Sequence, residues 1–105
     1  MGKLDFAEAT KKVKRIMKKY QEEFPDVKVD RDYYPFKLTE EWGECLQVYL
    51  MLTGRGRQKG KSKKQIHEML SEEFADVLGF LLLFAEAERI DPVKALNKKW
   101  FSRLK

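Results

Sequence analysis

Prolines and glycines divide this chain into four segments, and within each segment the apolar residues recur at helical spacing. The prolines stand at positions 25, 35 and 92, and three of the glycines gather at 54, 56 and 60. Apolar side chains three and four residues apart line one face of a helix, whereas a half-buried strand needs strict alternation. No alternating run rich in Val, Ile or Thr is present. The sequence therefore predicts an all-α fold of four helices.

The length of the chain fits one domain with one core. The chain has 105 residues, and we expect residues 1–105 to form a single all-α domain, a four-helix bundle with short links. The longest apolar run, Val77 to Ala85, has nine residues, whereas a bilayer span needs about 20. No signal peptide pattern is visible, and the single cysteine, Cys45, excludes a disulfide framework. We therefore expect a cytoplasmic protein without a membrane partner.

Caps and breakers place the four helices. The first is expected from about Asp5 to Phe24, and the second from Phe36 or Leu38 to Leu52. The third is expected from a capping box at Ser62 to about Glu88. The fourth has Asp91 as its N-cap and Pro92 as its first helical residue. Its apolar stripe contains Val93, Leu96, Trp100 and Leu104, and we expect Trp42 and Trp100 to lie in the core.

The third helix has an unusual apolar surface. From Val77 to Ala87 it is apolar nearly all round, which is typical of a helix that is central or lies in an oligomer interface. Three other helices of a chain this short leave part of that circumference uncovered, and soluble monomers rarely expose such a patch. The sequence therefore predicts a homo-oligomer, a homodimer or a homotetramer.

The charge pattern indicates an anionic partner. The formal net charge is +5, and the stretch from Arg55 to Lys64 holds six basic residues and no acid. A nucleotide, a nucleic acid or phosphate would suit this charge. The stretch is too rich in glycine for a helix and is expected to be a mobile loop. It either steers an anion toward a site or is simply a solvated connection, and the sequence leaves both open.

Two expected helices carry acidic motifs, and four of these acids lie beside core positions: Glu41, Glu44, Glu73 and Asp76. Glu40, Glu41 and Glu44 belong to the second helix, and Glu73 and Asp76 belong to the third. Each pair three residues apart shares a helix face. No Lys or Arg occurs from residue 39 to 51 or from residue 65 to 88. These acids therefore have no obvious counter-charge within their own segments.

Inward acids need compensation, because burying an ionised carboxylate costs several kcal/mol. Four such groups on facing helices would repel one another, and a multivalent cation could hold them charged. Hard oxygen ligands suit Mg2+ or Mn2+. A lone Glu-Glu-x-x-Glu is common on solvated helices, but the second motif, surrounded by apolar residues, favours a metal site.

The two acidic motifs resemble the signature of a known family. Glu40-Glu41-x-x-Glu44, a gap of 28 residues and Glu73-x-x-Asp76 are similar to the MazG-like nucleoside triphosphate pyrophosphohydrolases, of the all-α NTP pyrophosphatase superfamily. The gap is near the long end for such proteins. The resemblance covers about Leu38 to Arg103, and three further stretches carry it: Ser71–Leu82, Ile90–Pro92 and Asn97–Arg103.

The resemblance implies a specific activity. Such enzymes cleave a nucleoside triphosphate between the α and β phosphates and release the monophosphate and pyrophosphate, a housekeeping role in the nucleotide pool. Glu40 would orient or deprotonate the attacking water. The implied Mg2+ ligands are Glu41, Glu44, Glu73 and Asp76, and the implied contacts to the triphosphate or sugar are Asn97, Lys99 and Arg103. The aromatic candidates for stacking on the base are Tyr33, Tyr34, Phe36 and Phe80.

Two other classes of function compete with this prediction. A basic helical protein that binds nucleic acid would explain the positive charge, but the inward acids argue against nucleic acid as the partner. A regulatory or assembly protein could keep the bundle without turnover. Within the enzyme prediction the base stays open, and canonical deoxynucleotides, dUTP, dCTP and damaged nucleotides are all compatible with the sequence.

Overall fold

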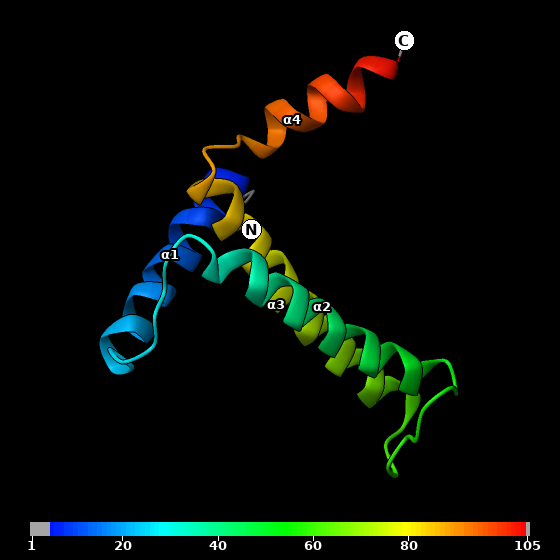
Figure 1. Ribbon diagram of the computed structural model, residues 1–105. Helices are drawn as coiled ribbons and strands as arrows, with labels where there is room; N and C mark the ends of the chain where they lie inside the picture. Colours follow the sequence, from blue (N-terminus) through cyan, green and yellow to red (C-terminus); the bar gives the residue numbers. More distant parts are fainter. Residues whose placement is uncertain (1–4, 105) are drawn as a thin grey trace.

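The computed structural model describes residues 5–104, and the regular structure within that range is entirely helical (Figure 1). The elements are α1 (Phe6–Glu23), α2 (Tyr33–Leu52), α3 (Lys63–Ala87), α4 (Pro92–Lys99) and a short 3-10 turn, η1 (Phe101–Arg103). The all-α prediction is thereby confirmed. None of the described helices combines the length and the apolar character that crossing a membrane requires.

The starts of three helices are set by side chains that cap their N-termini, as the sequence predicts. Asp5 and Asp91 each accept a hydrogen bond from the backbone amide three residues on, at 2.8 and 3.0 Å. Ser62 and Gln65 form the full capping box, in which each side chain accepts from the backbone amide of the other. These contacts satisfy amides that a helix leaves unpaired.

The start of α2 differs from the prediction. The helix begins at Tyr33, three residues before the earliest expected start, and Pro35 lies inside its first turn. The first backbone N–H groups of a helix have no intrahelical partner, so a proline there removes no hydrogen bond. The Tyr33 amide is itself bound by the Asp30 carboxylate at 3.1 Å. Pro35 therefore does not act as the boundary that the sequence predicted.

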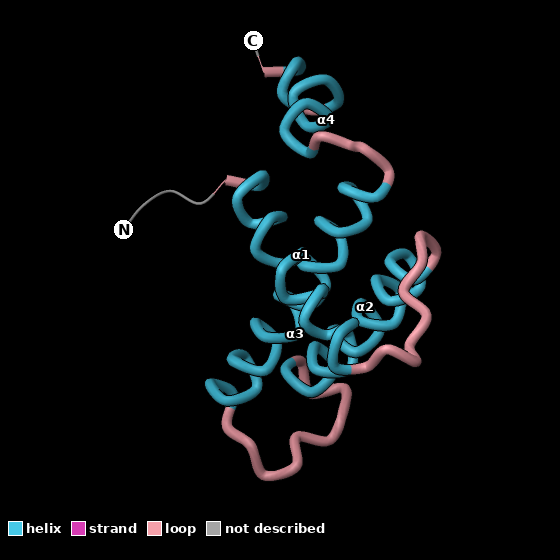
Figure 2. Tube along the Cα trace, turned by 90° about the vertical axis from the view of Figure 1, so that its left-hand side faces the viewer, coloured by secondary structure: helices cyan, strands magenta, loops and turns pink. Residues whose placement is uncertain are grey.

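The molecule is organised around α3. Helices α2 and α3 form a long antiparallel pair, and α1 packs across the C-terminal half of α3 (Figures 1 and 2). The residues that this packing buries are Met17, Cys45, Val48, Ile66, Leu82, Leu83 and Ala85. Of the two positions that the sequence allows for the apolar third helix, the single chain shows the central one, although Leu81 of this helix is 46% exposed.

Helix α4 stands apart from the other three. It packs on η1 and projects away from the end of α3 in both views (Figures 1 and 2). A single chain therefore packs three helices together and does not itself form the expected four-helix bundle. The core prediction for the two tryptophans is wrong: Trp42 is 51% and Trp100 is 67% exposed. Trp42 lies on α2, Trp100 follows the last residue of α4, and both side chains are largely open within residues 5–104.

Two ion pairs attach α1 and the following loop to the end of α3. Lys14 lies 3.0 Å from Glu86, and Arg31 lies 2.6 Å from Glu88 through its Nε atom. Three of the four side chains are half or more exposed, so each pair contributes little to stability. The attachment of α1 depends mainly on its apolar face, which includes the buried Met17.

Candidate metal centre

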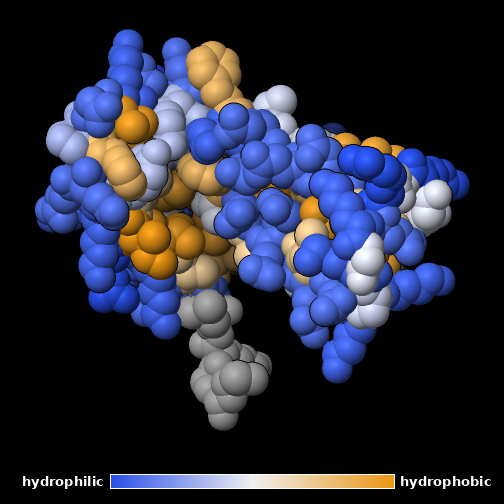
Figure 3. Space-filling view, turned by 90° about the horizontal axis from the view of Figure 1, so that it is seen from below, coloured by the Kyte–Doolittle hydropathy of each residue, from blue (hydrophilic) through white to orange (hydrophobic). Residues whose placement is uncertain are grey.

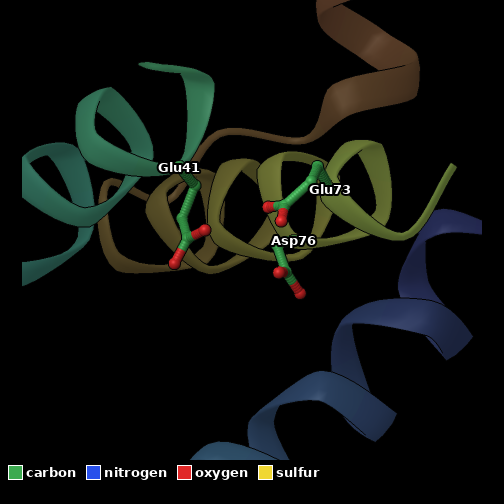
Figure 4. A group of neighbouring side chains, drawn as sticks. All are labelled: Glu41, Glu73 and Asp76. Atoms are coloured by element: carbon green, nitrogen blue, oxygen red, sulfur yellow. The ribbon is translucent and has the colours of Figure 1, made fainter. Parts of the chain in front are cut away.

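Three carboxylates from two helices converge at the middle of the molecule. Glu41 projects from α2, and Glu73 and Asp76 project from one face of α3 toward the same space (Figure 4). One oxygen atom of each carboxylate lies within 4.8 Å of the other two. We call these three residues the acidic cluster. Residues three apart share a helix face, which is why Glu73 and Asp76 act together.

Two oxygens of the acidic cluster are buried without a hydrogen-bond partner. They are Oε2 of Glu41 and Oε2 of Glu73. The Glu41 side chain is only 12% exposed. Buried polar atoms nearly always have a partner, and leaving one unpaired costs free energy. Hard, anionic oxygens in this state fit a Mg2+ or Mn2+ ion, which would supply the missing partner.

Two members of the acidic cluster, Glu41 and Glu73, have a raised pKa. Burial is the largest cause that raises the pKa of Glu41 to about 7, followed by the adjacent carboxylate of Glu44 and the charge of Asp76. Lys37 acts in the opposite direction on Glu41. Burial, and then the charges of neighbouring acids, also raise the pKa of Glu73. Without a cation, the carboxyl group of Glu41 is therefore partly protonated near pH 7.

Lys37 is a residue of the site that the sequence reasoning missed. Its Nζ atom lies 3.6 Å from Oε1 of Glu41, pairs with the carboxylate of Glu40, and lies 5.8 Å from the centre of the Phe80 ring. The search for counter-charges began at residue 39, but Lys37 precedes Glu41 by four residues and so shares its helix face. That spacing was the signal that could have found it.

A pocket of about 400 Å³ opens beside the acidic cluster. Glu41, Asp76 and Lys37 form its charged edge. The remaining wall is aromatic or apolar and comes largely from α1 and α3: Val13, Ile16, Met17, Tyr20, Tyr33, Ala75, Gly79, Phe80 and Leu83. Seen from below, hydrophobic surface gathers beside α1, toward the left of Figure 3.

Two of the aromatic candidates meet in this pocket. The rings of Tyr33 and Phe80 approach edge to face, with centroids 6.3 Å apart. Tyr34 and Phe36 do not line this pocket, and the Phe36 side chain is 71% exposed. Ile16 and Tyr20 belong to the apolar stripe that the spacing of the first helix predicts. Their place in the wall of this pocket was not foreseen, because such a stripe does not say which element it will meet.

Two of the acids predicted on α2 lie at the margin of the cluster. Glu44 is exposed, and its carboxylate contributes to the raised pKa of Glu41 without belonging to the closest group of three. Glu40 is exposed and turned to Lys37. The structure therefore brings together Glu41, Glu73 and Asp76, with Glu44 and Glu40 beside them.

The predicted contacts to the triphosphate lie elsewhere. Asn97 and Lys99 belong to α4 and Arg103 belongs to η1, and all three are exposed. Because α4 ends at Lys99, Lys99 and Arg103 do not share one continuous α-helix as predicted. Within a single chain, α4 does not bring these residues to the acidic cluster, since it projects away from α1–α3 (Figure 1).

No known protein family, curated protein or solved structure matches this chain. A function is therefore inferred from the residues of the site themselves.

Proposed function

We propose that the chain is a MazG-like, Mg2+-dependent nucleoside triphosphate pyrophosphohydrolase, which converts a (d)NTP to the monophosphate and pyrophosphate. One observation carries the proposal: the acidic cluster holds two buried oxygens without partners and opens directly on the pocket of about 400 Å³. Pockets of roughly 300–1,000 Å³ accommodate small organic ligands. A cation site beside an apolar pocket of this size suits a ligand with a charged phosphate end and a flat base.

The charges of the site dictate how a triphosphate could approach. Its roughly four negative charges would be repelled by Glu41, Glu73 and Asp76 unless these residues held a cation. Bound Mg2+ would polarise the phosphoryl oxygens and lower the pKa of a bound water. Glu44 lies close enough to Glu41 to join the ligand set when the group is ionised. Glu40 is the group we assign to orient the attacking water.

Lys37 would act at the boundary between the two parts of the site. Its Nζ atom faces Glu40 and Glu41 on one side and the Phe80 ring on the other. A phosphate placed between the acids and the aromatic wall would therefore meet an ammonium group, which binds phosphate as a point charge. Tyr33 and Phe80 would then contact the base.

A homodimer or homotetramer would complete the site. Because α4 projects from its own chain (Figure 1), Asn97, Lys99 and Arg103 would act in the site of a second copy. The segment from α4 to residue 104 also exposes apolar side chains, among them Trp100 at 67% and Leu104 at 79% exposure. On the same chain, α2 exposes Trp42, Leu46, Tyr49 and Leu50. Burying these surfaces against one another in a symmetric assembly would carry the cations of one α4 toward the acids of its partner. Sedimentation equilibrium at low micromolar concentration tests this, and a fully active species of 12.5 kDa would contradict it.

The activity itself is tested with a panel of NTPs and dNTPs, by measuring monophosphate and pyrophosphate with and without Mg2+. We expect pyrophosphate release that stops in excess chelator and is abolished by Glu73→Gln. Glu72→Gln is the matched control, because it removes the same charge one residue away on α3, outside the acidic cluster. Turnover in excess chelator would refute the metal mechanism. Mg2+ binding without turnover of any nucleotide would favour the regulatory or assembly class instead.

A further inference from the structure

The loop between α2 and α3 lies at the end of the helical pair that is farthest from α1 and α4 (Figure 1). Residues 54–64 contain six basic side chains, no acid and no large apolar residue. We call Arg55, Arg57, Lys59, Lys61, Lys63 and Lys64 the basic loop. All six are exposed, and none of them forms an ion pair with a residue in the described range.

The basic loop has a defined backbone and not the free chain that its glycines suggest. The Arg55 amide donates to the Leu50 carbonyl at 2.8 Å. The Gln58 side chain donates to the Met51 carbonyl at 3.2 Å, and the Lys61 amide closes a turn on the Gln58 carbonyl at 3.0 Å. These bonds tie the loop to the last turn of α2, so its cations are presented from a fixed support.

Two features of the basic loop oppose local stability. Lys59 has a φ of 55°, in the left-handed region that favours glycine. Lys63 and Lys64 lie in the first turn of α3, where the positive end of the helix dipole disfavours cations, and no acid shares that turn. Glycine at position 59 and neutral residues at positions 63 and 64 would serve the fold better, and the two lysines of α3 therefore point to a role for their charges outside folding.

We propose that the basic loop binds the phosphate backbone of a nucleic acid strand, without regard to base sequence. Six unpaired cations exceed what one triphosphate needs, and they suit an array of phosphates along a chain. Arg55 and Arg57 offer the planar guanidinium groups that bind phosphate through two hydrogen bonds. The acidic cluster lies near the middle of α2 and α3, and Glu73 is nine residues beyond Lys64, about 14 Å along the helix axis. At physiological salt that distance exceeds the Debye length of about 8 Å, so these acids oppose binding at the loop only weakly.

An anionic membrane is the less suitable partner for this surface. Proteins that lie on membranes usually add apolar side chains that enter the lipid, and residues 54–64 provide none. The glycines and the polar Gln58 and Ser62 match the hydrogen-bonding groups that contact phosphate and sugar.

The test measures the affinity for labelled single-stranded DNA and RNA of mixed sequence, about 20 nucleotides long, by fluorescence anisotropy over a range of salt concentrations. The loop variant carries Arg55→Gln, Arg57→Gln, Lys61→Gln and Lys64→Gln. The control variant loses the same charge from the exposed face of α1: Lys11→Gln, Lys12→Gln, Lys18→Gln and Lys19→Gln. We expect the loop variant to bind at least tenfold more weakly, with the slope of log K against log salt reduced by about 3. The control should stay within about threefold of the parent.

Three results would overturn the proposal. Equal weakening of both variants would assign the binding to net charge and not to the loop. The absence of binding to either oligonucleotide at low salt would exclude a nucleic acid partner. Loop-dependent binding to vesicles containing phosphatidylserine, without binding to oligonucleotides, would identify a lipid surface as the partner. Circular dichroism of both variants ensures that a loss of binding is not a loss of helix.

Discussion

The α2–α3 pair carries opposite charges in two places, the acidic cluster near the middle of both helices and the basic loop at one end. At the acidic cluster, the side chain of Glu41 is 12% exposed and two carboxylate oxygens have no partner. At the basic loop, all six cations are exposed to water. Water stabilises an exposed charge, whereas a buried one must find a counter-charge or a proton. The buried carboxylates of Glu41 and Glu73 therefore depend on a proton or a bound cation, whereas water already stabilises the cations of the basic loop.

The largest expected effect concerns catalysis and distinguishes the acidic cluster from the basic loop most sharply. Asp76→Asn removes a charge that the proposed metal requires, and we expect pyrophosphate release to fall at least about 100-fold. The loop variant with four substitutions should keep its turnover within about threefold of the parent at physiological salt, because salt screens the electrostatic attraction between distant charges. Steady-state kinetics with saturating Mg2+ measures both. A similar loss of pyrophosphate release in the two variants would contradict the distinction between the acidic cluster and the basic loop.

The next effect is a pH dependence of stability that arises from the acidic cluster. In the folded state, burial and the neighbouring acids raise the pKa of Glu41 from its ordinary value of 4.5 to about 7. The folded state therefore binds this proton more tightly, so its stabilisation is complete at low pH and is lost as pH rises from about 4.5 to about 7.

We expect the Tm of the metal-free protein to fall by roughly 5 °C between pH 5.5 and pH 8. Mg2+ at pH 8 should restore most of it, because a bound cation replaces the lost proton. Differential scanning fluorimetry with and without chelator measures the shift. A Tm that rises over this interval in chelator would contradict the prediction.

A single substitution in the acidic cluster should reproduce the stability of the protonated state. Glu41→Gln keeps the shape of the side chain and removes the charge, so the metal-free Tm at pH 8 should rise by about 4 °C. Glu40→Gln is the matched control, since Glu40 is exposed and paired with Lys37. That variant should leave the Tm unchanged or slightly lower. Equal shifts in the two variants would mean that burial does not distinguish these neighbours.

The smallest expected effect concerns the basic loop. Lys63→Gln removes a cation from the first turn of α3, where the helix dipole opposes it, and should raise the Tm by about 2 °C. The increase should shrink at high salt, since the charges are exposed. Thermal unfolding at low and high ionic strength measures both. A decrease in Tm would show that Lys63 has a stabilising partner in solution.

Local signals in the sequence predicted the helices well. Asp5, Ser62 and Asp91 cap their helices as expected, because a cap depends on one side chain and an amide three residues away. Pro35 misled the prediction of α2, because a proline that ends a helix and one in its first turn look alike in sequence. The breakers therefore give the number of helices more reliably than their first residues.

Tertiary placement was predictable only in part. The structure brings Glu41, Glu73 and Asp76 together. Glu44 was expected in the same inward group but is exposed and lies outside it, and Asp76 is exposed too, because helical spacing fixes the face of a side chain but not what covers that face. The positions of Trp42 and Trp100 were predicted wrongly, because an apolar stripe indicates that a face seeks a partner without saying which element provides it. The same reason explains why α4 was expected within the bundle of its own chain.

The pocket has walls of unequal attachment. Helices α2 and α3 carry the carboxylates and pack closely along their length, whereas α1, which supplies Ile16 and Tyr20, rests mainly on α3. A shift of α1 would widen the pocket and leave the spacing of the acids intact. Substitutions on α1 would therefore change the shape of the pocket while the spacing of the acidic cluster stays the same.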